Sequence, residues 1–191
     1  AFEEHFKKEL LAFQNRREGP LFKFDEEGFW QIQHVKKQLD QDFGYLYSFF
    51  ENSEIIPFSR SKLQEDSTQL FLFYEARNKL LGYINGKLSA SEVFDLDKLA
   101  KLYALYDLFK GYHGLTWHNQ RFYYNPMTEL IEPVSFDVFT ENEDFKISSK
   151  PFLGYDLREK NISYFGEVHY VFQAFNDNLF RTKYYQYLDQ Y

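Results

Sequence analysis

The stretch formed by residues 95–137 constrains the fold more than any other, because it predicts a helix, a polar turn and a β-hairpin in succession. Asp95 is a residue type that favours the first position before a helix, and Gly111 favours its end. Between them, apolar residues recur at helical spacing over 96–109. One predicted helix face carries Leu99, Leu102, Tyr103, Tyr106 and Phe109.

The hairpin is predicted from alternating residues on both sides of a turn. Arg121 to Asn125 forms the first predicted strand and Leu130 to Phe136 the second. Asn125-Pro126-Met127-Thr128 supplies the residue types of a turn between them. A hairpin brings its two outer ends together, so residues just before the first strand and just after the second should be neighbours.

The rest of the chain adds mostly helices. Apolar spacing predicts helices over residues 1–15 and 67–84, with helical signals over 30–39 and a helical tail over 168–187 that breaks near Asn176-Asp177. Leu21–Phe24 is a predicted short strand, Pro57 a predicted break, and residues 138–163 a predicted loop. We therefore expect a single domain over residues 1–191 of α+β class, mostly helical around a central β-hairpin or small sheet.

Composition supports a packed core and excludes several classes of protein. Aromatic residues make up 21% of the chain, with 23 Phe and 16 Tyr, which favours a large core over a surface that stacks sugars or bases. A net charge of −7 argues against nucleic-acid binding. The absence of Cys excludes thiolate zinc sites and a Cys nucleophile. No apolar stretch approaches membrane-spanning length. The first residue is Ala, so we expect a fragment of a longer chain.

Candidate chemistry concentrates at the two outer ends of the predicted hairpin. Asn119 lies just before the first strand, and Asp137 follows the second. An amide oxygen and a carboxylate are hard ligands that suit Mg²⁺. Protein kinases place an Asn and an Asp in this way around their metal ions. The sequence therefore predicts a magnesium site at Asn119 and Asp137, although either residue could instead serve as a cap or turn residue.

Several segments resemble the spore-coat-protein CotH kinase-like family, a group of divergent minimal protein kinases. The resemblance is carried by DLDKLAKLYALYDLF, WHNQRFYYNP and LIEPVSFD in the centre of the chain. Weaker support comes from FEEHFKKELL and NRREGPLFKFDEE near the start and from FNDNLFRTKYYQYLDQY at the end. Together these blocks cover most of the chain.

The resemblance implies a protein-kinase-like fold rich in C-lobe elements, and phosphoryl transfer from ATP with Mg²⁺. The acceptor would be a protein of the cell envelope or surface, which implies an extracytoplasmic location. Protein kinases place a catalytic Asp five residues before the metal-binding Asn, and this chain has Gly114 there. His113 or Asp107 would then act as the catalytic base. Lys23 would hold phosphates, paired with Glu3 or Glu4, unless a Lys upstream of Ala1 does so.

Alternatives remain for individual residues. Asp107 is either a catalytic carboxylate or a buried partner of Arg121. Arg121 is either a phosphate clamp or an ion-pair partner of Asp107 or Glu132. His113 and His118 are structural, or they form a zinc or iron site with Asp137.

The function has an alternative as well. A non-catalytic, pseudokinase-like module that binds a protein or ligand would explain the absence of an Asp at position 114 and of a glycine-rich phosphate loop. A carbohydrate-binding module would require a flat row of exposed Tyr or Trp side chains.

Overall fold

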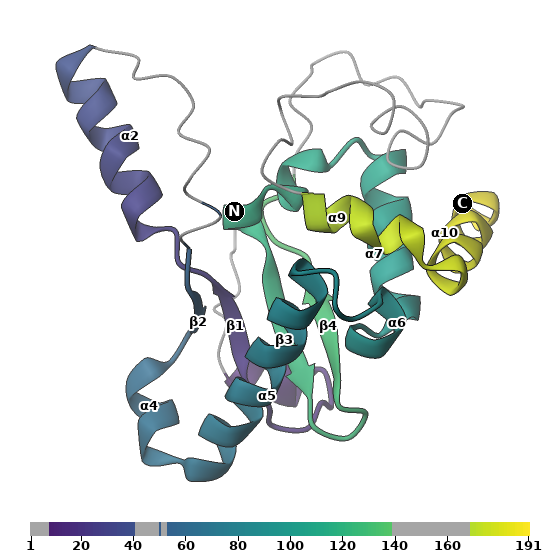
Figure 1. Ribbon diagram of the computed structural model, residues 1–191, viewed down its shortest axis with the longest axis horizontal. Coiled ribbons are helices and arrows are strands. Elements are labelled where there is room, and N and C mark those ends of the chain that lie inside the picture. Colours follow the sequence, from purple (N-terminus) through teal and green to yellow (C-terminus); the bar gives the residue numbers. More distant parts are fainter. Residues whose placement is uncertain (1–7, 41–49, 51–52, 139–168) are drawn as a thin grey trace.

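The protein is an α+β domain built around a small antiparallel sheet, as expected, and it is seen here in a computed structural model (Figure 1). The structure describes residues 8–40, 50, 53–138 and 169–191. Its sheet has four strands in the order β2-β1-β3-β4. These strands are β1 (Leu21–Phe24), β2 (Ile55–Pro57), β3 (Arg121–Asn125) and β4 (Leu130–Val134). The predicted hairpin is therefore confirmed as β3 and β4, and β1 and β2 extend it into a sheet.

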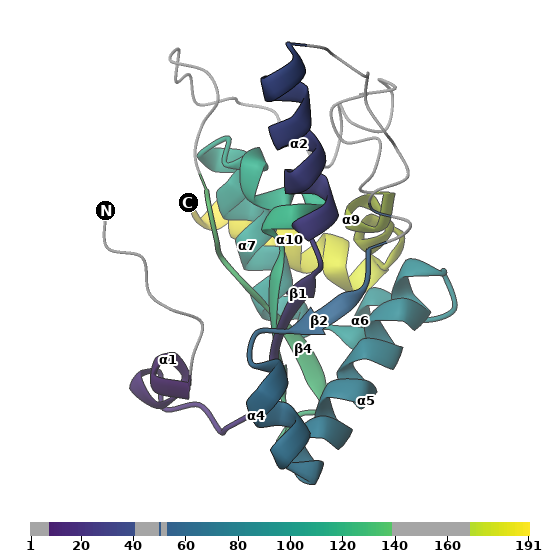
Figure 2. The ribbon, with the colours of Figure 1, turned by 90° about the vertical axis from the view of Figure 1, so that its left-hand side faces the viewer.

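Helices surround this sheet on several sides (Figures 1 and 2). Among the described residues, no helix combines the length and the apolar character needed to cross a membrane. The α-helices are α1 (Lys8–Phe13), α2 (Glu27–Leu39), α4 (Arg60–Glu65), α5 (Ser67–Ile84), α6 (Ala90–Val93), α7 (Leu96–Leu108), α9 (His169–Gln173) and α10 (Asn178–Gln190). Short 3-10 helices are η1 (Tyr112–Leu115), η2 (Trp117–Asn119) and η5 (Ala174–Asn176).

Three aspartates fix where α5, α7 and α10 begin. Asp66 accepts hydrogen bonds from the backbone of the first turn of α5, Asp95 does so for α7, and Asp177 for α10. Each carboxylate satisfies backbone N–H groups that lack a partner within the helix. The capping role predicted for Asp95 is confirmed, and so is the break near Asn176-Asp177 in the helical tail.

The two faces of the sheet bury different residues, because side chains alternate along a strand. Phe22 on β1 stacks on Phe122 of β3, with ring centroids 5.4 Å apart, and also meets Phe73 of α5. These rings belong to the main hydrophobic core. The opposite face has a smaller apolar cluster that includes Leu21 and Tyr123. Most aromatic side chains of the sheet are thus buried, which agrees with the prediction that the aromatic residues form a large core.

Pro57 does not break the chain as expected. It is the last residue of β2, where it pairs with Phe22 of β1. β2 is an edge strand, and an edge strand tolerates Pro because one of its sides needs no backbone donor. The predicted helix over residues 1–15 is described only from Lys8 to Phe13. The predicted loop after Val138 lies outside the described residues.

Helix α10 packs along α7 and joins the C-terminal part of the chain to the core (Figure 1). Phe180 and Tyr184 of α10 are fully buried. The ring of Phe180 meets that of Tyr103 on α7 edge to face, with centroids 5.4 Å apart. The C-terminal helix therefore contributes aromatic side chains to the core.

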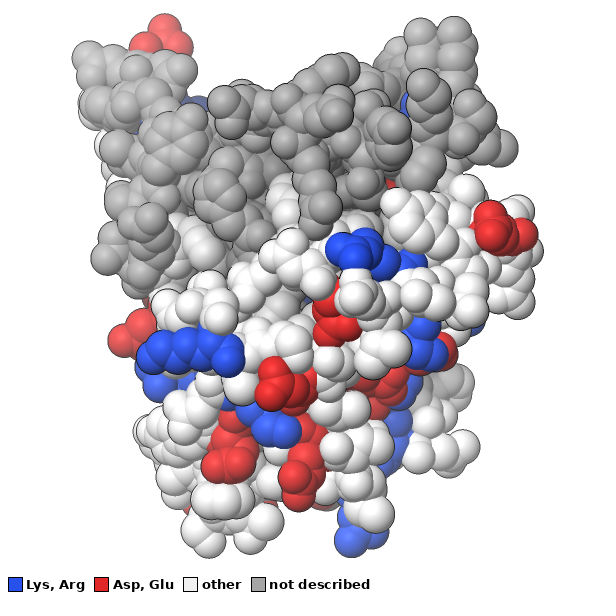
Figure 3. All heavy atoms as spheres, turned by 45° about the vertical axis from the view of Figure 1, so that its right-hand side comes forward, with Lys and Arg blue, Asp and Glu red and all other residues white. Residues whose placement is uncertain are grey.

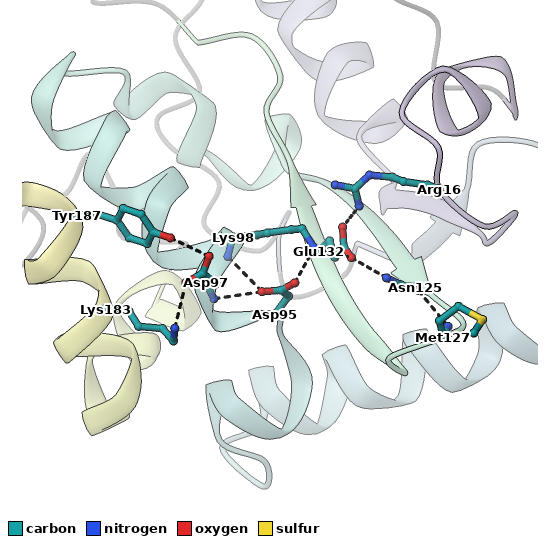
Figure 4. A network of polar contacts seen from close by, with 9 residues as sticks. All are labelled: Arg16, Asp95, Asp97, Lys98, Asn125, Met127, Glu132, Lys183 and Tyr187. Carbon is teal, nitrogen blue, oxygen red and sulfur yellow. Dashed lines mark hydrogen bonds and ion pairs between the residues drawn. The ribbon is translucent and has the colours of Figure 1, made fainter. Parts of the chain in front are cut away.

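A buried carboxylate on β4 connects several distant segments (Figure 4). Glu132 is only 1% exposed, and it contacts the guanidinium group of Arg16, Lys98 Nζ at 2.9 Å and Asn125 Nδ2 at 2.9 Å. Lys98 also binds Asp95, at 2.6 Å.

On the face shown in Figure 3, acidic and basic side chains are interspersed and do not form separate acidic and basic patches.

Candidate functional site

The short turn between α7 and β3 brings Asn119 and Asp137 to a common neighbour, His113. The side-chain nitrogen of Asn119 donates a hydrogen bond to the backbone carbonyl of His113, at 3.1 Å. The imidazole Nε2 of His113 lies 3.3 Å from Oδ2 of Asp137. The two residues predicted from the hairpin geometry therefore contact the same residue of η1, Asn119 at its backbone and Asp137 at its side chain.

These three residues differ in their access to solvent. Asn119 is buried, the His113 side chain is 22% exposed, and the Asp137 side chain is 46% exposed. Asp137 has a φ of 48°, a left-handed conformation that Asp tolerates better than most residues. The carboxylate of Asp137 is thus the member of the group that an incoming ligand can reach most easily.

The oxygen atoms of Asn119 and Asp137 suit Mg²⁺ better than zinc or iron. The Asn119 amide nitrogen is used by the His113 carbonyl, so its oxygen is the atom that could face a cation. Among the described residues, no group of three or more His, Asp or Glu is arranged to hold a metal. The described residues thus give no three-ligand support to the zinc or iron alternative, whereas Mg²⁺ commonly takes one or two protein ligands and completes its shell with water and phosphate.

Lys23 and Arg121 form a pair of cations that share one carboxylate. They lie directly opposite each other on β1 and β3. Like charges in this position repel, so a shared anion is needed. Oε1 of Glu26 accepts from Lys23 and, at 3.1 Å, from Arg121 Nη2. Burial favours a higher pKa for Glu26, but hydrogen bonds from Lys23 and Trp30 and the charge of Arg121 outweigh it and lower the pKa.

Glu26 corrects the pairing expected for Arg121. Within the described part of the chain, Arg121 forms its ion pair with Glu26, and none joins it to Asp107 or Glu132. Lys23 is likewise paired with Glu26, while Glu3 and Glu4 lie outside the described residues. Glu26 follows Lys23 by three residues, just before α2 begins, and this spacing was the sequence signal that could have identified it.

Arg121 is buried and holds the turn, which argues against the phosphate clamp. Its side chain is 5% exposed, and Nη1 donates to the backbone carbonyls of His118, at 2.6 Å, and Gln120, at 3.2 Å. The guanidinium also lies over the ring of Phe136, 4.4 Å from its centroid. Of the two predicted phosphate-binding cations, Lys23 is the more accessible, with a side chain that is 22% exposed.

Aromatic rings line the other side of the turn. His118 stacks on Phe29 of α2, with centroids 4.8 Å apart, and meets Trp30 at 5.5 Å and His113 at 6.2 Å. Burial lowers the pKa of His118 to about 4, so this imidazole is neutral at neutral pH. Trp117 is buried beside it. His118 therefore serves as a packing residue between the turn and α2.

Asp107 is buried, and the hydrogen-bond partners that the described residues provide differ from the predicted Arg121. The hydroxyl of Tyr112 donates to Oδ1 at 2.7 Å, and the hydroxyl of Tyr184 on α10 donates to Oδ2. Asp107 is 5% exposed. Two phenol donors thus stabilise the carboxylate and connect α7 to α10, which argues against Asp107 as the catalytic base.

Gly114 occupies a position where a side chain does not fit. A Cβ atom at this residue would lie 2.9 Å from the hydroxyl oxygen of Tyr106 and 3.0 Å from Val138. The Tyr106 hydroxyl is held by Ser135, at 3.2 Å. An Asp at position 114 would have to displace these groups, so His113 is the better placed of the predicted bases.

A separate hollow of about 590 Å³ lies between the end of α5 and α9, and none of its lining residues belongs to the predicted site. It is lined by Tyr83, Gly86, Lys87, Leu88, Ser89, Ala90, Phe172, Gln173, Asn176 and Asp177.

Comparison of the chain with models of known protein families, with curated proteins and with solved structures gave no match.

Proposed function

We propose that this domain binds ATP with Mg²⁺ and belongs functionally with the kinase-like phosphotransferases. Asn119 and Asp137 would hold the metal ion, and Lys23 would contact the phosphates. His113 would accept the proton of the acceptor hydroxyl, which a protein of the cell envelope or surface would provide. The resemblance to the CotH kinase-like family motivates the choice of ATP and of a protein acceptor.

The observation that carries this proposal is the contact of His113 with both Asn119 and Asp137. This arrangement places a carboxylate, an amide and an imidazole at the open end of one hairpin. A cation bound there would lie next to a residue type that accepts protons near neutral pH. Lys23 lies on the neighbouring strand β1 and adds a positive charge on the same sheet.

A second candidate is a non-catalytic module that binds nucleotide or a partner protein. It is favoured by Gly114, because the position of the kinase catalytic Asp is closed by Tyr106 and Val138. The ion pairs of Lys23 and Arg121 with Glu26 also favour it, since both cations are already used within the domain. The two candidates share the nucleotide site and differ in whether phosphate is transferred.

Thermal unfolding tests the shared site. The midpoint is measured with ATP alone, Mg²⁺ alone and both, for the wild type and for an Asn119→Ala, Asp137→Ala double variant. A ligand at a hundred times its Kd stabilises the folded state by about 2.7 kcal/mol. We expect an ATP-dependent rise that requires Mg²⁺ in the wild type and disappears in the double variant.

A matched control is the Asn78→Ala, Asp189→Ala variant, since both side chains are exposed and lie on α5 and α10. It should respond to ATP with Mg²⁺ as the wild type does. Absence of any shift in the wild type at millimolar ATP with Mg²⁺ would contradict the proposal. If the shift is present, transfer of labelled γ-phosphate to a protein acceptor, and its loss in His113→Ala, distinguishes the enzyme from the module.

A further inference from the structure

Trp30 is exposed although its polar group is already bound. The residue is 52% exposed on the first turn of α2. Its indole N–H donates to Oε2 of Glu26 at 3.1 Å, which fixes the ring at this position. The solvent-exposed part of the ring is therefore apolar, and the hydrogen bond fixes its position. Such a surface suits a flat partner group that stacks, not one that needs a hydrogen bond from the indole.

Trp30 belongs to a row of rings that reaches the predicted metal ligands. It meets His118 with centroids 5.5 Å apart, and His118 meets His113 at 6.2 Å. His113 in turn contacts Asp137. One end of this row is thus a solvent-accessible indole, and the other is the carboxylate that would bind Mg²⁺.

The charges beside the row favour an anionic ligand. Glu26 receives the Trp30 indole on one oxygen and both Lys23 and Arg121 on the other. Of the two cations, Lys23 is the one that a ligand can reach, with a side chain that is 22% exposed. A molecule with a flat ring at one end and phosphates at the other would match the exposed indole, Lys23 and the metal pair together.

We infer that Trp30 is the stacking surface for the base of the bound nucleotide, so that ligand affinity depends on the base as well as on the phosphates. This inference rests on the proposed function and assigns the part of the ligand that Asn119, Asp137 and Lys23 do not contact. Stacking of a base on an aromatic side chain is sequence-tolerant, because every base has a π-face. Adenine and guanine nucleotides should therefore bind with similar affinity.

Calorimetric titrations with two ligands separate the base from the phosphates. ATP and inorganic tripolyphosphate, each with Mg²⁺, are titrated into the wild type and into Trp30→Leu, Trp30→Phe and Tyr74→Leu. Tyr74 is 51% exposed on α5 and serves as the matched control. We expect Trp30→Leu to weaken ATP binding about 5- to 150-fold without changing tripolyphosphate binding. Trp30→Phe should retain most of the affinity, and Tyr74→Leu should behave as the wild type.

Intrinsic fluorescence gives an independent readout, because the chain has only two Trp residues and Trp117 is buried. ATP should change the emission of Trp30, and tripolyphosphate should not. If Trp30→Leu leaves ATP binding intact, or weakens both ligands equally, the stacking role is wrong while the metal and phosphate site stands. If the wild type binds neither ligand, the proposed function fails, and this inference fails with it.

Discussion

Lys23 and Arg121 lie directly opposite each other on neighbouring antiparallel strands, and one oxygen of Glu26 accepts from both. Substitution Glu26→Gln keeps the size of the side chain but removes the charge that offsets the two cations. We expect the free energy of unfolding to fall by about 1.5–3 kcal/mol, the range for hydrogen bonds to charged groups. Chemical denaturation measures this change.

The neighbouring residue provides the control for this substitution. Glu27 is exposed, and Glu27→Gln should change stability by less than about 0.5 kcal/mol. Adding Lys23→Met to Glu26→Gln should recover part of the loss, because the repulsion between the two opposed cations is then removed. Equal losses for Glu26→Gln and Glu27→Gln would show that the shared carboxylate does not stabilise the sheet.

The bond between Tyr184 and Asp107 should contribute measurably to the attachment of α10. Tyr184→Phe removes one of the hydroxyl groups that donate to the buried Asp107 carboxylate. Leaving a buried acceptor without its donor costs about 1–3 kcal/mol. Tyr185→Phe is the control, since Tyr185 is 41% exposed on the same helix. Equal stability of the two variants in urea titrations would argue against this role for Tyr184.

Two glycine substitutions should change stability in opposite directions. Gly114→Ala introduces a Cβ atom 2.9 Å from the Tyr106 hydroxyl oxygen and should destabilise the domain by about 1–3 kcal/mol. Gly28→Ala lies in α2, where a Cβ atom meets nothing within 4 Å, and should stabilise it by about 0.5–1 kcal/mol. Thermal unfolding of both variants tests these signs. A neutral Gly114→Ala would mean that position 114 has room for a catalytic Asp.

Acid should destabilise the domain through His118. The pKa of His118 is lowered to about 4 in the folded state, against about 6.5 when unfolded. The unfolded chain therefore binds more protons between these values, and stability falls as the pH drops from about 6.5 to about 4. Between pH 7 and pH 4.5, this residue should account for a loss of about 2–3 kcal/mol.

This effect is isolated by comparing variants at both pH values. His118 faces Glu26, Asp137, His113 and Arg121, whose charges also influence its titration. His118→Gln should show a smaller loss of stability between pH 7 and pH 4.5 than the wild type. His34→Gln, at an exposed position on α2, should show the same loss as the wild type. Identical losses in all three proteins would exclude His118 as a source of the acid sensitivity.

Local signals in the sequence were sufficient to predict most of the helices and the hairpin. The helix over 67–84 and the strand over 21–24 have the predicted bounds, because capping residues and residue spacing act within a few residues. Asn119 and Asp137 lie at the two outer ends of the hairpin, as local geometry predicts, and both contact His113. β2 was missed, because a three-residue edge strand that ends in Pro has no periodic pattern of its own.

Side-chain partners between distant segments could not be predicted in the same way. The sequence contains several acidic residues that could pair with Arg121, and only the packing of α2 against the turn selects Glu26. Asp107 was also assigned the wrong partner. The described residues that donate to it are Tyr hydroxyls, and residue patterns assign such Tyr side chains to the core. The pairing of Arg121 with Glu26 is thus decided by the relative placement of elements, whereas the Lys23–Glu26 pair could be recognised from its spacing along the chain.

The contacts of Glu132 have a consequence for how the domain opens. The carboxylate joins Arg16, before β1, to Lys98 on α7 and Asn125 on β3. Asp97, beside Lys98, binds Lys183 and Tyr187 of α10. Detachment of α10 should therefore disturb the contacts by which Glu132 holds Arg16, just before β1. Backbone amides in the hairpin, α7 and α10 should exchange with deuterium at a similar rate, as one cooperative unit, whereas those of α2, which has no buried residue, should exchange earlier.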